Sequence, residues 1–136
     1  MKEITGKLIV ISAPSGTGKT TVVKKLLQQS ANLEASVSFT TRKMRENEKK
    51  GLDYFFVSEK TFANMIQNDD FLEHATVFGN FYGTEKKSVS ENLEKGVNVI
   101  LEIDWQGALQ IKSSMPSCVM IFLIPPSRDV LLRRLK

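Results

Sequence analysis

Residues 13–20, Ala-Pro-Ser-Gly-Thr-Gly-Lys-Thr, constrain the fold of this chain more than any other stretch. They follow an apolar run at residues 8–11 and precede an amphipathic run at residues 21–27, which predicts a strand, a glycine-rich turn and a helix. Gly16 and Gly18 lack a Cβ, so backbone N–H groups can turn inward and surround phosphate oxygens at the start of the helix. The pattern predicts a loop that binds the phosphates of a nucleotide.

Two side chains of this loop suit a nucleoside triphosphate and its metal ion. Lys19 can reach the β- and γ-phosphates, and the hydroxyl group of Thr20 suits Mg²⁺. The alternative is a glycine-rich turn with an incidental Lys-Thr pair, but strand, glycines, lysine, threonine and helix all favour nucleotide binding. Ala13 stands where the strict pattern has its first glycine, a mild departure. The candidate triphosphate-binding residues are Ala13, Pro14, Ser15, Gly16, Thr17, Gly18, Lys19, Thr20 and Thr21.

Length and composition limit the class of protein. The 136 residues, 41% of them hydrophobic, can bury one core, and the net charge of +4 fits an anionic small ligand. No basic run is long enough to follow a nucleic-acid backbone, and no apolar stretch approaches the length of a membrane span. The single cysteine, Cys118, lies in an apolar run typical of a reduced core residue. We therefore expect a cytoplasmic protein without nucleic-acid or membrane partners.

The chain alternates predicted strands and helices on either side of a more polar insertion. The predicted strands are residues 8–12, 37–39, 54–57, 71–78, 81–84, 97–103 and 119–123, with a hairpin turn at Gly79-Asn80. The predicted helices are residues 19–29, a segment capped by Ser58, residues 85–95 ended by Gly96, residues 105–112, and a last helix from Ser127 onward. This order predicts an α/β fold of the P-loop NTPase type, a mostly parallel sheet wound by helices.

The insertion, at about residues 36–82, is too polar and hairpin-like to belong to that sheet. We expect it to form a small α+β subdomain, while residues 1–35 and 83–136 form the core. Arg42 and Arg45 lie three residues apart in this insertion, and Tyr54 follows nine residues later. Arginine forks and a tyrosine hydroxyl can all donate to one phosphate group. Taken alone, however, such a stretch is more typical of a solvated basic loop, so both interpretations stay open.

Two acidic residues lie at the end of the apolar run of residues 97–103. Glu102 and Asp104 would lie at the carboxyl end of a buried strand, where a P-loop protein needs negative charge near Mg²⁺. Asp104 also directly precedes the helix predicted at residues 105–112, so it can serve as the N-cap of that helix. The two roles are compatible, and we expect both.

Seven sequence blocks make this chain resemble the bacterial guanylate kinases along essentially its whole length. They occur in the order of that family, and together they are far more specific than the phosphate-binding loop alone. Ala13 matches the family's own variant of the loop. The blocks are residues 12–20, 37–45, 51–57, 71–74, 79–84, 101–107 and 125–127.

The resemblance implies reversible transfer of the γ-phosphoryl group of MgATP to GMP or dGMP, giving ADP and GDP. It implies a clamp on the GMP phosphate made of Arg42, Arg45, Tyr54 and Tyr82. It assigns guanine binding to Ser38, Glu73 and Thr84, and a carboxylate such as Glu73 can accept hydrogen bonds from both N1–H and N2–H₂ of guanine. Glu102 and Asp104 match the acidic pair near the acceptor, with Asp104 and Thr20 at the metal ion. The implied catalytic residues are Lys19, Arg42, Arg45 and Asp104.

Two other functions are open alternatives. A non-catalytic guanylate-kinase-like module would dock a phosphorylated or acidic peptide, but such modules have a degraded phosphate loop, and here the loop is complete. A P-loop kinase for another acceptor, such as AMP, is disfavoured by the guanine-binding set of Ser38, Glu73 and Thr84.

The resemblance also bears on the length of the chain. Guanylate kinases continue into an arginine-bearing lid, a further core strand and a terminal helix, whereas the helix predicted from Ser127 is still running at Lys136. Arg134 resembles an arginine at the entrance to that lid, and we expect it to contact ATP. We further expect these residues to bind GMP but to be poorly active without the lid. Apolar surface left exposed would favour association, so a homo-oligomer is left open.

Overall fold

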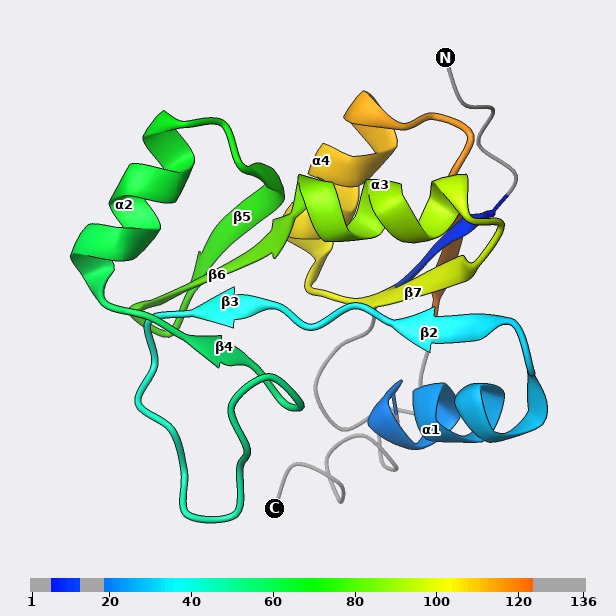
Figure 1. Cartoon of the computed structure of the whole chain (residues 1–136), viewed down its shortest axis with the longest axis horizontal. Helices are drawn as coiled ribbons and strands as arrows, with labels where there is room; N and C mark the ends of the chain where they lie inside the picture. Colours follow the sequence, from blue (N-terminus) through cyan, green and yellow to red (C-terminus); the bar gives the residue numbers. More distant parts are fainter. Residues whose placement is uncertain (1–5, 13–18, 124–136) are drawn as a thin grey trace. The chain divides into compact units, whose positions relative to one another are not determined.

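The computed structural model describes residues 6–12 and 19–123, which divide into two compact units (Figure 1). The first unit combines the segments up to Ala35 and from Asn92 onward, and the second unit is Ser36–Glu91. The strands are β1 (Leu8–Ser12), β2 (Leu33–Ala35), β3 (Phe39–Thr40), β4 (Phe55–Phe56), β5 (Phe71–Val77), β6 (Asn80–Glu85), β7 (Asn98–Glu102) and β8 (Val119–Phe122). The helices are α1 (Lys19–Gln29), α2 (Glu59–Gln67), α3 (Lys86–Glu94) and α4 (Trp105–Ser114).

The first unit contains a four-stranded parallel sheet with the strand order β2-β7-β1-β8. Figure 1 shows α1 on one side of this sheet and α4 on the other. This arrangement confirms the predicted α/β class of parallel sheet wound by helices. In the register, Ile11 pairs with Glu102 and Ser12 pairs with Phe122, so β1, β7 and β8 end at the same edge.

Strand alternation builds the core of the first unit. Ile11, Ile100 and Val23 of α1 form one buried cluster, joined by Leu26 and Leu27. Successive residues of a strand point to opposite faces, so Val10 and Leu101, both buried, belong to the face covered by α4. Each fully buried aliphatic side chain contributes about 1.5–3 kcal/mol. The apolar runs of the sequence are thus explained by burial on both faces of the sheet.

The second unit contains a mixed four-stranded sheet with the order β4-β3-β6-β5. Strands β3 and β4 are parallel, and the other pairs are antiparallel. Helix α2 covers one face of this sheet through Phe62, whose ring centroid lies 4.5 Å from that of Phe71 and 5.5 Å from that of Phe81. As predicted, Ser58 caps α2, and its side chain accepts a hydrogen bond from the Thr61 N–H.

A β-bulge in β5 sends the side chains of Phe71 and Glu73 to opposite faces of this sheet. The register shifts between Phe71, which pairs with Glu85, and Glu73, which pairs with Thr84. Phe71 therefore points to the α2 face and crosses over Gly83, where a Cβ would lie only 2.6 Å from the phenyl ring. Glu73 points to the opposite face, because the extra residue of a bulge reverses the alternation.

The hairpin between β5 and β6 turns one residue earlier than predicted. Val77 pairs with Asn80, and the turn residues are Phe78 and Gly79, with φ angles of 50° and 78°. Two positive φ angles are the mark of a type I′ turn. The packing of Phe81 against Phe62 fixes the strand register, since a shift by one residue would move Phe81 to the other face.

Other differences concern short or edge elements. Strand β2 was not predicted, because its three residues include a single large apolar side chain, Leu33. The strand predicted at residues 37–39 lies at Phe39–Thr40. Strand β8 was expected to be buried but is partly exposed, because it forms the edge of the described sheet. The helix predicted from Ser127 lies outside the described residues.

The end of α3 agrees with the prediction in detail. Gly96 has a φ of 83°, a conformation that favours glycine. The N–H of Gly96 donates to the Leu93 carbonyl, and the N–H of Val97 donates to the Asn92 carbonyl. This pair of hydrogen bonds is the Schellman motif, which ends the helix just before β7.

Candidate nucleotide-binding site

The predicted triphosphate-binding loop is only partly within the described residues. Residues 13–18 and Arg134 lie outside them. Lys19 and Thr20 are the first residues of α1, but their side chains are not described, and Thr21 is exposed in the same turn. The buried Ser12 ends β1 directly before the loop. The first unit therefore has the strand and the helix that the sequence pattern requires on either side of this segment.

The second unit carries the residues predicted to bind the base and the phosphate of GMP, and the acidic pair of Glu102 and Asp104 lies in the first unit. On β5 and β6, Glu73 lies opposite Thr84, and Tyr82 lies two residues before Thr84. On β3, Phe39 pairs with Gly83, so continuing this antiparallel register brings Ser38 level with Thr84. Directly opposite residues share a face, as do residues two apart on a strand. Ser38, Glu73, Tyr82 and Thr84 therefore share the face opposite α2.

Glu73 and Thr84 form a buried hydrogen-bonded pair. The Thr84 hydroxyl donates to Glu73 Oε1 at 2.6 Å, and the two residues are 0% and 3% exposed respectively. A buried carboxylate is costly unless hydrogen bonds replace its lost water. The bulge that turns Glu73 to this face, and the hydroxyl placed opposite it, thus build a carboxylate into a protected position.

The two tyrosines and Arg42 are brought together on this face. The ring centroids of Tyr54 and Tyr82 lie 5.9 Å apart in an edge-on arrangement. The Cζ atom of Arg42 lies 5.2 Å from the Tyr54 centroid, within cation–π distance. Three members of the predicted phosphate clamp are therefore neighbours.

Two threonines anchor the loop that carries both arginines. The Thr40 hydroxyl, fully buried, donates to the Phe81 carbonyl at 2.9 Å and accepts from the Arg42 N–H at 3.2 Å. The Thr41 hydroxyl accepts from the Phe81 N–H at 3.0 Å, and the Thr41 N–H donates to the Phe81 carbonyl at 3.1 Å. Three of these bonds tie the start of the loop to β6, and the fourth, from the Arg42 N–H to Thr40, fixes where Arg42 leaves the sheet.

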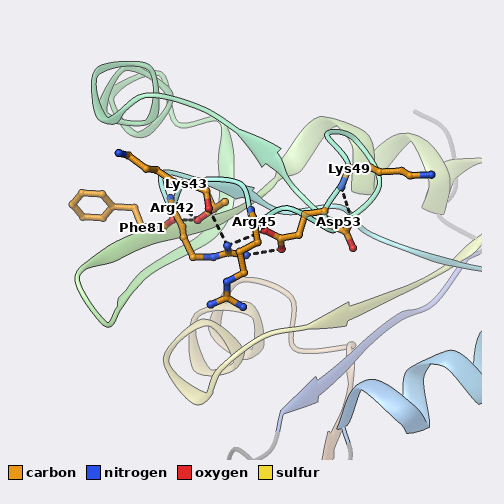
Figure 2. A network of polar contacts seen from close by, with 8 residues as sticks. Arg42, Lys43, Arg45, Lys49, Asp53 and Phe81 are labelled. Carbon is orange, nitrogen blue, oxygen red and sulfur yellow. Dashed lines mark hydrogen bonds and ion pairs between the residues drawn. The ribbon is translucent and has the colours of Figure 1, made fainter.

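Within the loop, Glu48 binds the guanidinium group of Arg42 in two places (Figure 2). Arg42 Nη1 donates to Oε1 at 2.9 Å, and Nη2 donates to Oε2 at 2.7 Å. Hydrogen bonding to Glu48 is the main reason why the pKa of Arg42 is raised, and burial opposes it. Hydrogen bonds from Arg42, and then from the Arg45 N–H, lower the pKa of Glu48 from 4.5 to about 2. The pair is fully charged at neutral pH.

Arg45 takes part through its backbone. Its N–H donates to Glu48 Oε1 at 2.7 Å, and its carbonyl accepts from the Glu48 N–H at 3.0 Å. Figure 2 shows the guanidinium group of Arg45 outside the hydrogen-bonded network. Asp53 steadies the far end of the loop, where its carboxylate accepts from the Lys49 N–H at 2.7 Å.

The two acidic residues of the first unit lie at and just beyond the end of β7. Asp104 caps α4 as predicted, with Oδ1 accepting from the Gly107 N–H at 3.1 Å. Its Oδ2 accepts from Gln106 Nε2 at 3.0 Å. Glu102 is the last residue of β7 and is exposed. Among the described residues, no group of three or more His, Cys, Asp or Glu could enclose a metal ion.

The sequence pattern missed Glu48, Thr40 and Thr41 as parts of this site. Thr40 and Thr41 stand in a block used for the resemblance, but nothing in their spacing shows that they bond Phe81, some forty residues away. Glu48 lies in a stretch rich in charges of both signs, where a solvated acidic residue is common. The available signal was an acidic residue a few positions beyond two arginines.

Comparison with known proteins gives the family. The family model for guanylate kinase matches residues 5–136. The chain belongs to the guanylate kinase family. The guanylate kinase of Saccharophagus degradans is 52% identical over 131 residues, covering 96% of this chain and 64% of that protein. The guanylate kinase of Legionella pneumophila strain Paris is 50% identical over 130 residues, covering 96% of this chain and 62% of that protein.

A solved structure agrees with the sequence comparison. The crystal structure of guanylate kinase from Anaplasma phagocytophilum superposes with a TM-score of 0.83 at 44% identity, covering 98% of this chain and 68% of that one. The chain spans slightly less than two thirds of the two relatives above. The resemblance carried by the seven sequence blocks is thus confirmed, and these names give no support to a non-catalytic guanylate-kinase-like module.

Across residues 6–12 and 19–123, no helix has the length and apolar character needed to cross a bilayer.

Proposed function

We propose that this guanylate kinase family member binds GMP on the second unit and phosphorylates it with ATP, giving ADP and GDP. The observation that carries the proposal is the buried pair of Glu73 and Thr84, which shares a sheet face with Tyr82. A buried carboxylate generally stabilises a protein no more than an apolar side chain of similar size at the same position. We therefore infer that Glu73 serves to bind a ligand.

The chemistry of guanine fits this carboxylate. Guanine presents N1–H and N2–H₂ side by side, and a carboxylate has about four acceptor sites, so Glu73 can accept from the base as well as from Thr84. Adenine has an acceptor at the position of the guanine N1–H, and an acceptor facing a carboxylate would leave both groups unpaired. The site therefore favours guanine over adenine by mismatch as well as by attraction. Ser38, level with Thr84, completes the proposed base-binding set.

The phosphate of GMP would bind to the clamp of Arg42, Arg45, Tyr54 and Tyr82. The closeness of Arg42 to the tyrosine pair supports this assignment. Guanidinium and phenol groups donate, and the phosphate monoester offers only acceptors at neutral pH. Arg45 has its guanidinium outside the internal network, so it can turn toward an incoming phosphate.

ATP and Mg²⁺ belong to the first unit in this proposal. Residues 13–21 and Arg134 would bind ATP, with Lys19 on its terminal phosphates. Asp104 and Thr20 would hold Mg²⁺, with Glu102 near the acceptor. Mg²⁺ is usually held by one or two protein oxygens together with phosphate and water, so a sparse donor set such as Asp104 fits it. When bound, Mg²⁺ supplies charge neutralisation of the phosphate oxygens.

The protein needs to supply little covalent chemistry for this reaction. The attacking group is already a phosphate oxygen, so no general base is needed. Transfer passes through a loose, in-line transition state whose charge is stabilised by fixed cations. Lys19, Arg42 and Arg45 would supply those cations. We place the protein in the cytoplasm with small-molecule partners, GMP or dGMP and ATP.

A coupled assay of ADP formation with GMP, dGMP, AMP and CMP tests the proposal. We expect GMP and dGMP to be phosphorylated and AMP and CMP to be rejected. The variant Lys19→Ala should lose at least about 100-fold in transfer, since it removes transition-state charge stabilisation, while GMP binding persists. GMP binding with no detectable ADP formation, even at high protein concentration and long reaction times, would instead favour a non-catalytic binding module. Equal turnover of AMP and GMP would reject Glu73 as the base-selecting group.

A further inference from the structure

Glu48 hydrogen-bonds both arginines of the predicted clamp, although it is absent from that clamp. Its carboxylate accepts from Arg42 Nη1, Arg42 Nη2 and the Arg45 backbone N–H, at 2.9, 2.7 and 2.7 Å. One side chain therefore joins the guanidinium group of the first arginine to the backbone of the second. The Arg42 and Glu48 side chains are only 13% and 16% exposed, so this pair is better protected than an ordinary surface ion pair.

We propose that Glu48 is a positioning residue for the acceptor phosphate, which holds Arg42 and Arg45 so that both present donors to the phosphate monoester of GMP. The inference rests on the proposed function, because it assumes that the acceptor phosphate binds at these arginines. It adds a residue that does not itself touch the substrate, since an anionic carboxylate would repel the phosphate.

The bonding of Arg42 determines which edge of its guanidinium group faces outward. Arginine has five N–H donors. Two on the end edge bind Glu48, and a third, on Nη1, donates to the Lys43 carbonyl at 3.0 Å. The other two, on Nη2 and Nε, share the side edge, which can bind two phosphate oxygens at once. Tyr82, another member of the proposed clamp, also contributes to the raised pKa of Arg42, so its side chain lies near this guanidinium group.

A second interpretation is that Glu48 imitates the phosphate and competes with it for Arg42. The contacts favour positioning over competition for two reasons. Glu48 occupies the end edge and leaves the side edge for the ligand. Its bonds with the Arg45 backbone, in both directions, close a local turn that an incoming phosphate has no reason to open. A competitor would need to leave, whereas a positioning residue stays in place when the phosphate binds.

The test compares GMP with guanosine, which carries the same base and sugar without the phosphate. We would measure both dissociation constants for the wild-type protein, for Glu48→Gln and for Glu48→Asp. The glutamine variant replaces one acceptor oxygen with an amide donor that faces an arginine donor, and it removes the charge. We expect its GMP affinity to fall by about tenfold, within the range for loss of a charge-assisted bidentate pair, while its guanosine affinity stays unchanged. Glu48→Asp keeps the carboxylate and should recover part of the loss.

Glu46→Gln is the matched control, because Glu46 is an exposed glutamate two residues earlier in the same loop. It should bind both ligands as the wild-type protein does. Unchanged guanosine affinity in Glu48→Gln also shows that the variant is folded. In kinetics, the KM for GMP should rise while the KM for ATP stays constant.

The possible results distinguish three roles of Glu48: support of the fold, positioning of the arginines and competition with the phosphate. Equal losses for GMP and guanosine would mean that Glu48 only supports the fold. Unchanged GMP affinity would overturn the positioning role, and a gain in GMP affinity would establish competition instead. Failure of the wild-type protein to bind GMP more tightly than AMP would reject the proposed function, and this inference with it.

Discussion

At the residue scale, the site depends on how the sheet of the second unit orients Glu73. Because of the bulge after Phe71, the Phe71 side chain points to the apolar α2 face and the Glu73 side chain points to the opposite face. Thr84 then meets the carboxylate at 2.6 Å with both side chains buried. A carboxylate fixed in this way cannot rearrange cheaply for a wrong base, so we propose that its hydrogen-bond pattern selects guanine.

Glu73→Gln tests that selector. The amide would face the guanine N–H donors with a donor of its own, and an unpaired buried polar group costs about 1–3 kcal/mol. GMP affinity should therefore fall by about 10- to 100-fold, while ATP affinity changes by less than about twofold. Calorimetric titration of each nucleotide measures both values.

Glu85→Gln is the control for this change, because it lies on the same hairpin but on the α2 face. It should leave GMP affinity unchanged. Equal losses of GMP and ATP affinity in Glu73→Gln, or no loss of either, would remove Glu73 from the base-binding set.

The acid stability of the Arg42–Glu48 pair gives a second test at this scale. The pKa of Glu48 is lowered from 4.5 to about 2, mainly by the hydrogen bonds from Arg42. A group whose pKa is lower in the folded state stabilises the protein above its unfolded pKa, and this contribution is lost as pH falls toward the folded pKa. The difference in unfolding free energy between wild type and Glu48→Gln should thus be constant above about pH 5.5 and shrink between 4.5 and about 2.

Urea denaturation of both proteins across this pH range measures the difference, since the other carboxylates cancel in the comparison. A difference that already disappears between about pH 7 and pH 5 would mean that the carboxylate is not held by Arg42 in solution.

At the element scale, the same aspartate serves a helix and a proposed metal site. Asp104 caps α4 through its Oδ1 while Oδ2 bonds Gln106. A carboxylate at a helix N-terminus accepts hydrogen bonds from unpaired backbone N–H groups and interacts favourably with the helix dipole. The cap therefore keeps the carboxylate in one orientation at the end of β7, as a metal ligand requires.

Two substitutions separate these roles. Asp104→Asn keeps a capping side chain without the charge, so it should change the unfolding free energy by less than about 0.5 kcal/mol. Asp104→Ala removes the cap and should cost about 1 kcal/mol. Both variants should lower Mg²⁺-dependent phosphoryl transfer by at least about tenfold if Asp104 is a ligand.

Thermal unfolding and the ADP assay, run on the same preparations, check both effects. Full transfer activity in Asp104→Asn would assign the residue to helix capping alone.

At the scale of the whole molecule, the two units differ in how well the sequence predicted them. The parallel sheet of the first unit follows from buried apolar runs, and the bounds of β1 and α1 were predicted to the residue. The second unit depends on contacts between distant residues, such as the threonine bonds to Phe81 and the register that places the turn at Phe78 and Gly79. Local pattern cannot supply these, because they are set by pairing across the sheet.

The candidate site divides in the same way. Residue types and spacing were sufficient to single out Arg42 and Tyr54, whereas Glu73 and Thr84 were named only through the family resemblance. The supporting role of Glu48 needed the structure, because its importance lies in which edge of the Arg42 guanidinium it occupies. Spacing alone cannot distinguish that geometry from a solvated charge.

The central claim is that GMP binds to the second unit. Amide hydrogen exchange of the protein, followed with GMP, AMP or a non-hydrolysable ATP analogue, tests it most directly. At a GMP concentration about 100 times its dissociation constant, openings that break the site should become about 100-fold rarer, equivalent to about 2.7 kcal/mol. We predict slower exchange around residues 38–45, 73 and 82–84 with GMP, and no change there with AMP. Protection by GMP confined to the first unit, or equal protection by AMP, would contradict the account.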